Sequence, residues 1–131
     1  ARTTMELARV SMGLPPEGYR LDDRLREIHY GEWEGLRLPD MQQRDPGVFE
    51  MRGNDKWNVP PPAGEAYADV VVRVKDWYDG LSGPIVVVAH GGTMRALSVV
   101  LGLKDPREAA DFNVRQGIVY VFTDSAVTAF G

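Results

Sequence analysis

The stretch that decides the fold comprises residues 85–103, IVVVAHGGTMRALSVVLGL. It opens with β-branched residues and no polar alternation, a pattern typical of a parallel strand that is buried on both faces. His90 therefore stands at the carboxyl end of a predicted strand, and Gly91 and Gly92 allow a tight turn into a helix over 93–101. Because the N–H groups that open a helix attract anions, the turn indicates a phosphate site. The simpler interpretation, a tight turn with an incidental histidine, stays open.

The composition is that of an ordinary globular protein and predicts a single domain over residues 1–131. Hydrophobic residues make up 44% of the chain and charged residues 26%, values that argue against disorder. The formal charge of −4 at pH 7 argues against a nucleic-acid partner. No apolar stretch reaches the roughly 18 residues of a membrane-spanning helix. The absence of cysteine excludes disulfides, thiolate metal sites and cysteine nucleophiles. From the cysteine usage and the lack of a long apolar stretch, we expect a cytoplasmic protein without a membrane partner.

Helical patterns occupy much of the chain. Residues 1–12 are helical in pattern and stop at Gly13, which two prolines follow. Residues 38–52 offer short helical pieces, interrupted by Asp45-Pro46-Gly47. Over residues 67–81 the apolar side chains recur at the spacing of one helical face packed on a sheet.

Strand patterns fall between these helices. Residues 25–28 form a short strand candidate, and residues 117–122 form another near the C-terminus. A turn at residues 123–125 and a short strand through Thr128 predict a hairpin at the sheet edge. Because helices flank the run around Val87, the alternation favours a parallel layer with right-handed crossovers. The predicted fold class is therefore α/β, a three-layer α/β/α sandwich with a mostly parallel sheet.

Motifs that follow one another in order along the chain resemble those of one protein family. Residues 25–35, LREIHYGEWEG, match L-x-E-x-x-x-G-x-x-E-G, and residues 88–93, VAHGGT, resemble a second histidine motif. Residues 61–65, PPAGE, look like a P-x-G-E segment, and an R-x-x-x-W pattern follows at 73–77. Residues 1–4, ARTT, look like the tail of S-x-L-x-R-A-x-x-T-A. Together these motifs resemble the histidine phosphatase superfamily, the phosphoglycerate-mutase-like proteins.

The resemblance implies a site for phosphoryl transfer. It gives His90 a hydrogen bond to phosphate, and it gives Glu27 the proton that a leaving alkoxide requires. It implies that Gly91, Gly92 and Glu65 bind phosphate or substrate, although Glu65 precedes a predicted helix and its charge could instead cap that helix. The implied substrate is a small phosphomonoester, hydrolysed through a phosphohistidine without a metal or other cofactor.

One element of the family pattern is absent from the sequence. Members carry an R-H-G motif on their first strand, whose histidine becomes phosphorylated, and no R-H-G occurs in residues 1–131. We therefore expect a family member without its amino-terminal strand and helix, with the nucleophile in that segment. Loss of a strand exposes unpaired backbone and an apolar helix face, which predicts a homodimer or a domain swap. Two alternatives stay open: phosphoryl transfer of the mutase type, and a catalytically inactive remnant that binds phosphate.

The titratable residues also have simpler interpretations. Without its motif, Glu27 would be read as a solvated surface carboxylate. His29 matches no catalytic position and is interpreted as a structural or surface histidine. Glu27, His29 and His90 make a poor set of metal ligands, because no supporting pattern such as H-E-x-x-H is present.

Aromatic and basic residues near the motifs have two interpretations each. Trp33 and Trp57 either line the mouth of the site or pack in the interior. Arg95, one turn into the helix after the histidine motif, either faces the phosphate or pairs with a carboxylate. Arg2 is expected in solvent.

Overall fold

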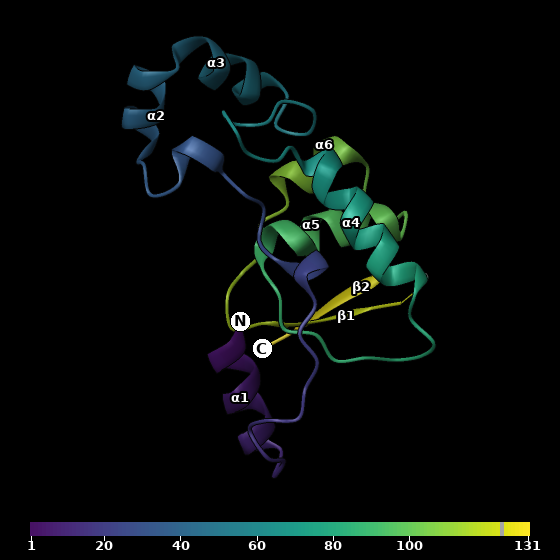
Figure 1. Cartoon of the computed structure of the whole chain (residues 1–131). Coiled ribbons are helices and arrows are strands. Elements are labelled where there is room, and N and C mark those ends of the chain that lie inside the picture. The colour runs from purple at the N-terminus through teal and green to yellow at the C-terminus, as the bar shows by residue number, and fades with distance from the viewer. Residues whose placement is uncertain (124) are drawn as a thin grey trace.

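The computed structural model describes residues 1–123 and 125–131. This part of the chain is mostly helical, with a two-stranded sheet near the C-terminus (Figure 1). None of the helices in it has the length and apolar character needed to cross a bilayer. The elements in chain order are α1 (Arg2–Ser11), the 3₁₀ turns η1 (Asp23–Leu25) and η2 (Gly31–Trp33), α2 (Leu38–Arg44), α3 (Pro46–Asn54), α4 (Tyr67–Asp79), α5 (Gly91–Val100), α6 (Pro106–Asp111), β1 (Val119–Phe122) and β2 (Val127–Phe130).

The hydrophobic core lies between α4 and α5. The buried side chains of α4 recur every three or four residues, as one face of a helix requires, and are Tyr67, Val70, Val74 and Trp77. Ala96 of α5 is fully buried in the same cluster. Both predicted helices are therefore confirmed, although α4 ends at Asp79 and α5 begins at Gly91.

Helices α2 and α3 form an arm at the upper left of Figure 1. The two predicted helical pieces are confirmed, and they meet at Asp45. Pro46 opens α3, a position at which its lack of an N–H costs no intrahelical bond. Trp33 anchors the arm, because its Nε1 donates to Asp45 Oδ2 at 2.7 Å and its ring packs against Phe49 with centroids 6.1 Å apart. The arm is thus tied to the loop that follows Glu27.

Helix α1 confirms the prediction for the start of the chain. It ends at Ser11, and Gly13 then adopts a positive φ of 73°, as helix C-termini commonly require. Within α1, all of which is described, no side chain is buried. Arg2 is exposed, as expected. Figure 1 shows the helix extending away from α4 and α5.

The three-layer sandwich with a mostly parallel sheet is not confirmed. Among the described residues the sheet consists of β1 and β2, which pair antiparallel with Val119 opposite Phe130. This pairing confirms the predicted hairpin. The predicted turn includes Asp124, which lies outside the described residues, and the Thr123 N–H beside it donates to the Ala126 carbonyl at 2.9 Å.

Residues 85–89 do not form the predicted buried strand. Within the described part of the chain, their backbone groups make no hydrogen bond to another backbone segment. Ile85 and Val86 are 55% and 74% exposed. β-branched residues favour an extended backbone, but a strand also needs a neighbouring strand that accepts and donates its hydrogen bonds. The local pattern therefore did not determine the pairing or the burial of this segment, and the predicted buried strand is wrong.

The predicted strand at residues 25–28 is also wrong, because η1 occupies its start and the carbonyl groups there bind side chains. Arg73 Nη1 donates to the carbonyls of Arg24 and Arg26 at 2.7 and 2.9 Å. Thr93 Oγ1 donates to the Arg26 carbonyl at 3.1 Å. Side-chain donors thus satisfy backbone acceptors that a sheet would otherwise satisfy, and they hold the segment against α4 and α5.

Candidate active site

The carboxylate of Glu27 lies at the N-terminus of α5. Its Oε1 accepts hydrogen bonds from the backbone N–H groups of Gly92 and Ile28, each at 2.9 Å. Within the described residues the other oxygen, Oε2, has no hydrogen-bond donor. The positive end of a helix attracts a carboxylate. This contact brings together two motifs that lie 65 residues apart in the sequence.

The contact requires glycine at position 92. A Cβ atom there would overlap Glu27 Oε1 and would lie 3.0 Å from Ile28 Cγ2. A Cβ at Gly91 would meet nothing closer than Arg95 Nη1 at 3.7 Å, an ordinary contact. The Gly92 N–H is already engaged by Glu27, so direct phosphate binding by Gly92 stays a prediction, as it does for Gly91.

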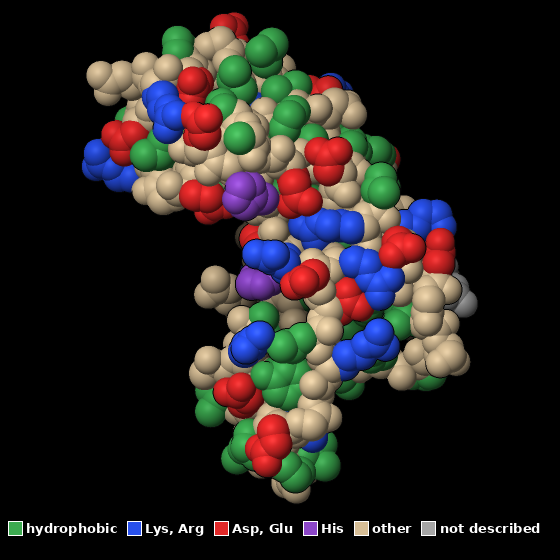
Figure 2. All heavy atoms as spheres, viewed as in Figure 1, with side chains coloured by type: hydrophobic (Ala, Val, Ile, Leu, Met, Phe, Trp, Pro, Cys, Tyr) green, Lys and Arg blue, Asp and Glu red, His purple; other side chains and the backbone are tan. Residues whose placement is uncertain are grey.

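His90 is the residue immediately before α5, with an extended backbone at φ −129° and ψ 166°. Its side chain is exposed, and its carbonyl accepts the Met94 N–H at 3.0 Å. His29 is exposed as well, and its Nδ1 accepts the Gly31 N–H at 3.2 Å, in keeping with a structural histidine. Figure 2 shows the two histidine side chains on the same face, on either side of a notch. Across the described residues, Glu27, His29 and His90 do not gather into a metal-ligand cluster.

The loop after Glu27 and the loop before α4 bind each other through their backbones. The Glu65 N–H donates to the His29 carbonyl, and the Glu32 N–H donates to the Pro62 carbonyl, each at 2.8 Å. The loops approach so closely that a Cβ at Gly64 would lie 2.6 Å from the His29 oxygen. Glycine in the P-x-G-E segment is therefore explained by this close approach.

Glu65 forms a bidentate ion pair with Arg73. Nε and Nη2 of Arg73 donate to the two carboxylate oxygens at 2.9 and 3.0 Å, and the His29 N–H donates to Oε2 at 2.9 Å. Partial burial by itself raises the pKa of the Glu65 carboxyl, but the hydrogen bonds from Arg73 and His29 outweigh burial and hold that pKa below its ordinary value of 4.5. Asp69, whose Oδ2 accepts the Ala66 N–H at 2.8 Å, caps α4 instead of Glu65.

Arg73 links the two motif loops to α4. Besides Glu65, its guanidinium binds the backbone carbonyls on either side of Leu25. Thr93, which is 2% exposed, holds the same segment from α5 through its hydroxyl group. These side chains fix the position of the backbone next to Glu27, and the Glu27 carboxylate reaches the α5 N-terminus from that anchored backbone.

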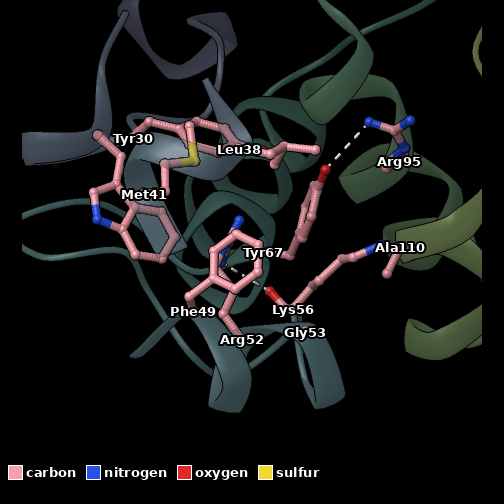
Figure 3. Close-up of a pocket in the computed structure, with 11 residues that line it drawn as sticks. Tyr30, Leu38, Met41, Phe49, Arg52, Gly53, Lys56, Tyr67, Arg95 and Ala110 are labelled. Atoms are coloured by element: carbon pink, nitrogen blue, oxygen red, sulfur yellow. Dashed lines mark hydrogen bonds between the residues drawn. The ribbon is translucent and has the colours of Figure 1, made fainter. Parts of the chain in front are cut away.

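A cavity of about 350 Å³ lies beside this site (Figure 3). Residues of the α2–α3 arm line one side, and residues of α4, α5 and α6 line the other. Trp33 lines the cavity and is only 2% exposed, so it packs in the interior at the same time. Trp57 stacks on Tyr67, which itself lines the cavity, with ring centroids 5.5 Å apart and planes tilted by 15°.

Arg95 follows the histidine turn by one turn of α5 and lines the same cavity. Its Nε donates to the Phe112 carbonyl at 2.9 Å, and its Nη1 donates to the Tyr67 hydroxyl at 3.2 Å. Within the described residues it therefore binds neutral oxygens, and the predicted pairing with a carboxylate is wrong. Burial raises the pKa of the Tyr67 hydroxyl, and the positive charge of Arg95 opposes that rise.

Sequence reasoning missed several residues around the site. Arg73 was identified only as part of a motif, and its spacing of eight residues from Glu65 gave no sign of an ion pair. Tyr67 and Arg52 were not singled out, because an aromatic residue at the start of an amphipathic helix and a basic residue in a polar helix are ordinary features. Only the folded chain, in which residues of the arm and of α4 lie on opposite sides of one space, reveals that both line one cavity.

The family model of the histidine phosphatase superfamily (branch 1) matches residues 1–125, and the chain belongs to this superfamily. The chain is 34% identical over 116 residues to a 2,3-bisphosphoglycerate-dependent phosphoglycerate mutase of Methylorubrum extorquens, covering 82% of this chain and 54% of the relative. It is 35% identical over 96 residues to a glucosyl-3-phosphoglycerate phosphatase of Mycobacterium tuberculosis, covering 63% of this chain and 42% of the relative.

Solved structures show the same fold relationship. The α-ribazole phosphatase of Shigella flexneri superposes with a TM-score of 0.78 at 24% identity, covering 98% of this chain and 65% of that chain. A mycobacterial glucosyl-3-phosphoglycerate phosphatase superposes with a TM-score of 0.62 at 25% identity, covering 82% of this chain and 68% of that chain. The chain spans about half the length of the curated relatives it matches, from 41% to 63%.

Proposed function

We propose that this chain carries the phosphate-binding and proton-donating part of a phosphatase site that hydrolyses small phosphomonoesters. One observation carries the proposal: Glu27 Oε1 lies 2.9 Å from the Gly92 nitrogen, at the N-terminus of the helix that His90 precedes. A candidate acid and a candidate phosphate donor thus converge on a helix end that favours anions. Membership of the superfamily supports the reaction class.

The proposed roles follow from the chemistry of each group. The exposed imidazole of His90 donates a hydrogen bond to an equatorial phosphate oxygen, and the Gly91 N–H at the helix end adds a second donor. Both hydrogen bonds to the Glu27 carboxyl go to Oε1, so Oε2 is the oxygen left to give a proton to the leaving group. Glu65 acts through Arg73, because both of its oxygens accept hydrogen bonds from that side chain.

The proposed reaction has two steps through a phosphohistidine. An imidazole nitrogen attacks phosphorus and forms a P–N bond, while the P–O bond to the alcohol breaks and Glu27 protonates the departing oxygen. Water then attacks phosphorus, Glu27 takes its proton, the P–N bond breaks, and inorganic phosphate leaves. The resemblance assigns the nucleophile to the R-H-G motif, which residues 1–131 do not contain. Phosphate binding therefore belongs to this chain, and turnover requires a form that includes an R-H-G segment.

Phosphoryl transfer of the mutase type is a second candidate, favoured by the similarity to a phosphoglycerate mutase. In that case the alcohol of a second bound molecule, rather than water, accepts the phosphoryl group. Analysis of the products distinguishes the two reactions: a phosphatase releases inorganic phosphate, whereas a mutase yields an isomeric phosphomonoester.

The proposal is tested by His90→Ala and Glu27→Gln. In the 131-residue chain, His90→Ala lowers the affinity for inorganic phosphate while the circular dichroism spectrum stays unchanged. In a form that includes an R-H-G segment, each variant lowers kcat/KM by about 10²-fold or more, the range found for the loss of one donor or general acid. Full activity in either variant removes that residue from the site. Phosphate binding without turnover in such a form supports the inactive, phosphate-binding alternative.

A further inference from the structure

The cavity beside the site has a one-sided distribution of charge. Its charged lining residues are Arg52, Lys56 and Arg95, and among the described residues that line it none is acidic. Flat aromatic rings make up much of the remaining wall, contributed by Tyr30, Trp33, Phe49 and Tyr67. Figure 3 shows these rings and the basic side chains around one space. The wall therefore offers a flat apolar surface with two guanidinium groups at its edge, whereas the Lys56 ammonium is paired with Asp111 at 3.1 Å.

Two guanidinium groups in this wall have only neutral partners within the described residues. Arg52 is 6% exposed, donates to the backbone carbonyls of Lys56 and Val59, and lies over the Tyr30 ring at 5.3 Å. Arg95 binds a carbonyl and a hydroxyl group, as described above. Four other arginines pair with carboxylates: Arg24, Arg37, Arg44 and Arg73. A desolvated guanidinium without a counter-charge favours the binding of an anion.

The cavity adjoins the candidate phosphate site. A Cβ at Gly91, at the histidine turn, would lie 3.7 Å from Arg95 Nη1, and Arg95 lines the cavity. Tyr30, three residues after Glu27, lines it from the other side. Arg95 and Tyr30 thus lie between the two sites, and a ligand with its phosphate at His90 would extend its remaining part past them into this space. The volume of about 350 Å³ lies within the range of small-molecule sites.

We infer that this cavity binds the alcohol part of the phosphomonoester, and that it selects alcohols with a flat apolar body and an acidic group. The aromatic rings contact the body. Arg52 and Arg95 receive the acidic group, a carboxylate or a second phosphate, which planar guanidinium groups bind through paired hydrogen bonds. The inference rests on the proposed function, because it takes the reacting phosphate to lie at His90.

The test compares three probes on the 131-residue chain by calorimetry: inorganic phosphate, phenyl phosphate and 4-carboxyphenyl phosphate. We expect phenyl phosphate to bind more tightly than inorganic phosphate, and we expect the carboxylate to improve affinity by a further factor of about ten, which is 1.4 kcal/mol. Arg52→Gln removes most of that further factor. Because Arg52 is buried and its variant can fail to fold, Lys56→Gln is a second test, with a loss of about twofold or more.

Two controls separate this inference from the proposed function. Lys75 lies on the exposed surface of α4, pairs with Asp79 and does not line the cavity. Lys75→Gln should therefore leave the affinity for every probe unchanged. His90→Ala lowers the affinity for all three probes by a similar factor, so the ratios between the three affinities stay the same. Equal affinity for the two organic probes, or a preference that the Lys56 and Arg52 variants leave intact, overturns the inference alone. Failure of inorganic phosphate to bind overturns the proposed function as well.

Discussion

Two segments with strand-like sequences, residues 25–28 and residues 85–89, end up in different surroundings. The first is anchored by Arg73 and Thr93, whose side chains bind its carbonyl groups. The second forms no regular element and is largely exposed, and among the described residues it has no backbone partner. An extended segment is thus fixed by the donors that other elements bring to it, and not by its own preference for an extended backbone.

The difference between the two segments explains how firmly each candidate site residue is held in place. Glu27 belongs to the anchored segment, so hydrogen bonds from α4 and α5 position its backbone and its carboxylate. His90 follows the exposed segment, and its position depends on the start of α5, where its carbonyl accepts the Met94 N–H. Variants that break the anchors of residues 25–28 should therefore affect catalysis and stability more than variants of residues 85–89.

The largest effect is expected for Gly92→Ala. The added methyl group overlaps Glu27 Oε1, the end of a flexible side chain, so the carboxylate moves and the fold survives. In a form that includes an R-H-G segment, we expect kcat/KM to fall by about 10²-fold, as for loss of a positioned acid. Gly91→Ala keeps the Gly91 N–H that is proposed to bind phosphate, and its methyl group meets nothing closer than 3.7 Å, so it is the matched control. Equal losses in the two variants would contradict the role given to Gly92.

Arg73→Met tests the anchor of residues 25–28. The variant leaves Glu65 and the bound carbonyl groups without a charged donor, and we expect the free energy of unfolding to fall by about 2–3 kcal/mol. Lys75→Met removes an exposed ion pair on the same helix and should cost no more than about 0.5 kcal/mol. Urea denaturation measures both values. A similar cost for the two variants would show that Arg73 contributes no more than a surface pair.

The Glu65–Arg73 pair also predicts a pH dependence of stability. The folded protein holds the pKa of Glu65 below 4.5, so this carboxylate stabilises the fold at pH values above 4.5. That contribution is lost as the pH falls through the lowered pKa. The difference in unfolding free energy between wild type and Glu65→Gln should therefore shrink when the pH falls below 4.5. A constant difference across that range would exclude the linkage.

The smallest effect on stability is expected at Val86. Because this side chain is 74% exposed, Val86→Asp should change the unfolding free energy of the monomer by no more than about 0.5 kcal/mol. The sequence predicts a homodimer or domain swap, and an exposed apolar segment with free backbone groups favours such pairing. Sedimentation should show a dimer for wild type and for Val72→Asp, an equally exposed control at 71%, and a monomer for Val86→Asp. A monomeric wild type would exclude the dimer.

The helices and the candidate site residues were accessible from the sequence. Apolar spacing identified α4 and α5, and the break at Asp45 separated α2 from α3, because these signals depend on neighbours close in sequence. The family resemblance assigned Glu27 and His90 to one site, and their roles there stay predictions; the 2.9 Å contact of Glu27 with Gly92 was not foreseen.

The sheet and the cavity were not accessible in this way. Pairing of residues 85–89 depends on distant backbone, which a local pattern does not report. The cavity is lined by residues from the arm, α4, α5 and α6, so the charges of Arg52 and Arg95 become informative only after folding. The hydrogen bonds from Arg73 to backbone carbonyls were equally inaccessible from the sequence, because every residue type supplies a carbonyl group.

The most direct test of the central claim is a titration of the isotope-labelled 131-residue chain with inorganic phosphate, followed by nuclear magnetic resonance. If His90 and the α5 N-terminus form the phosphate site, the His90 ring and the Gly91 and Gly92 amide signals shift together along one saturable curve. The His29 ring, exposed on the same face, stays unchanged. A response confined to His29, or no saturable shift at His90, would contradict the site described here.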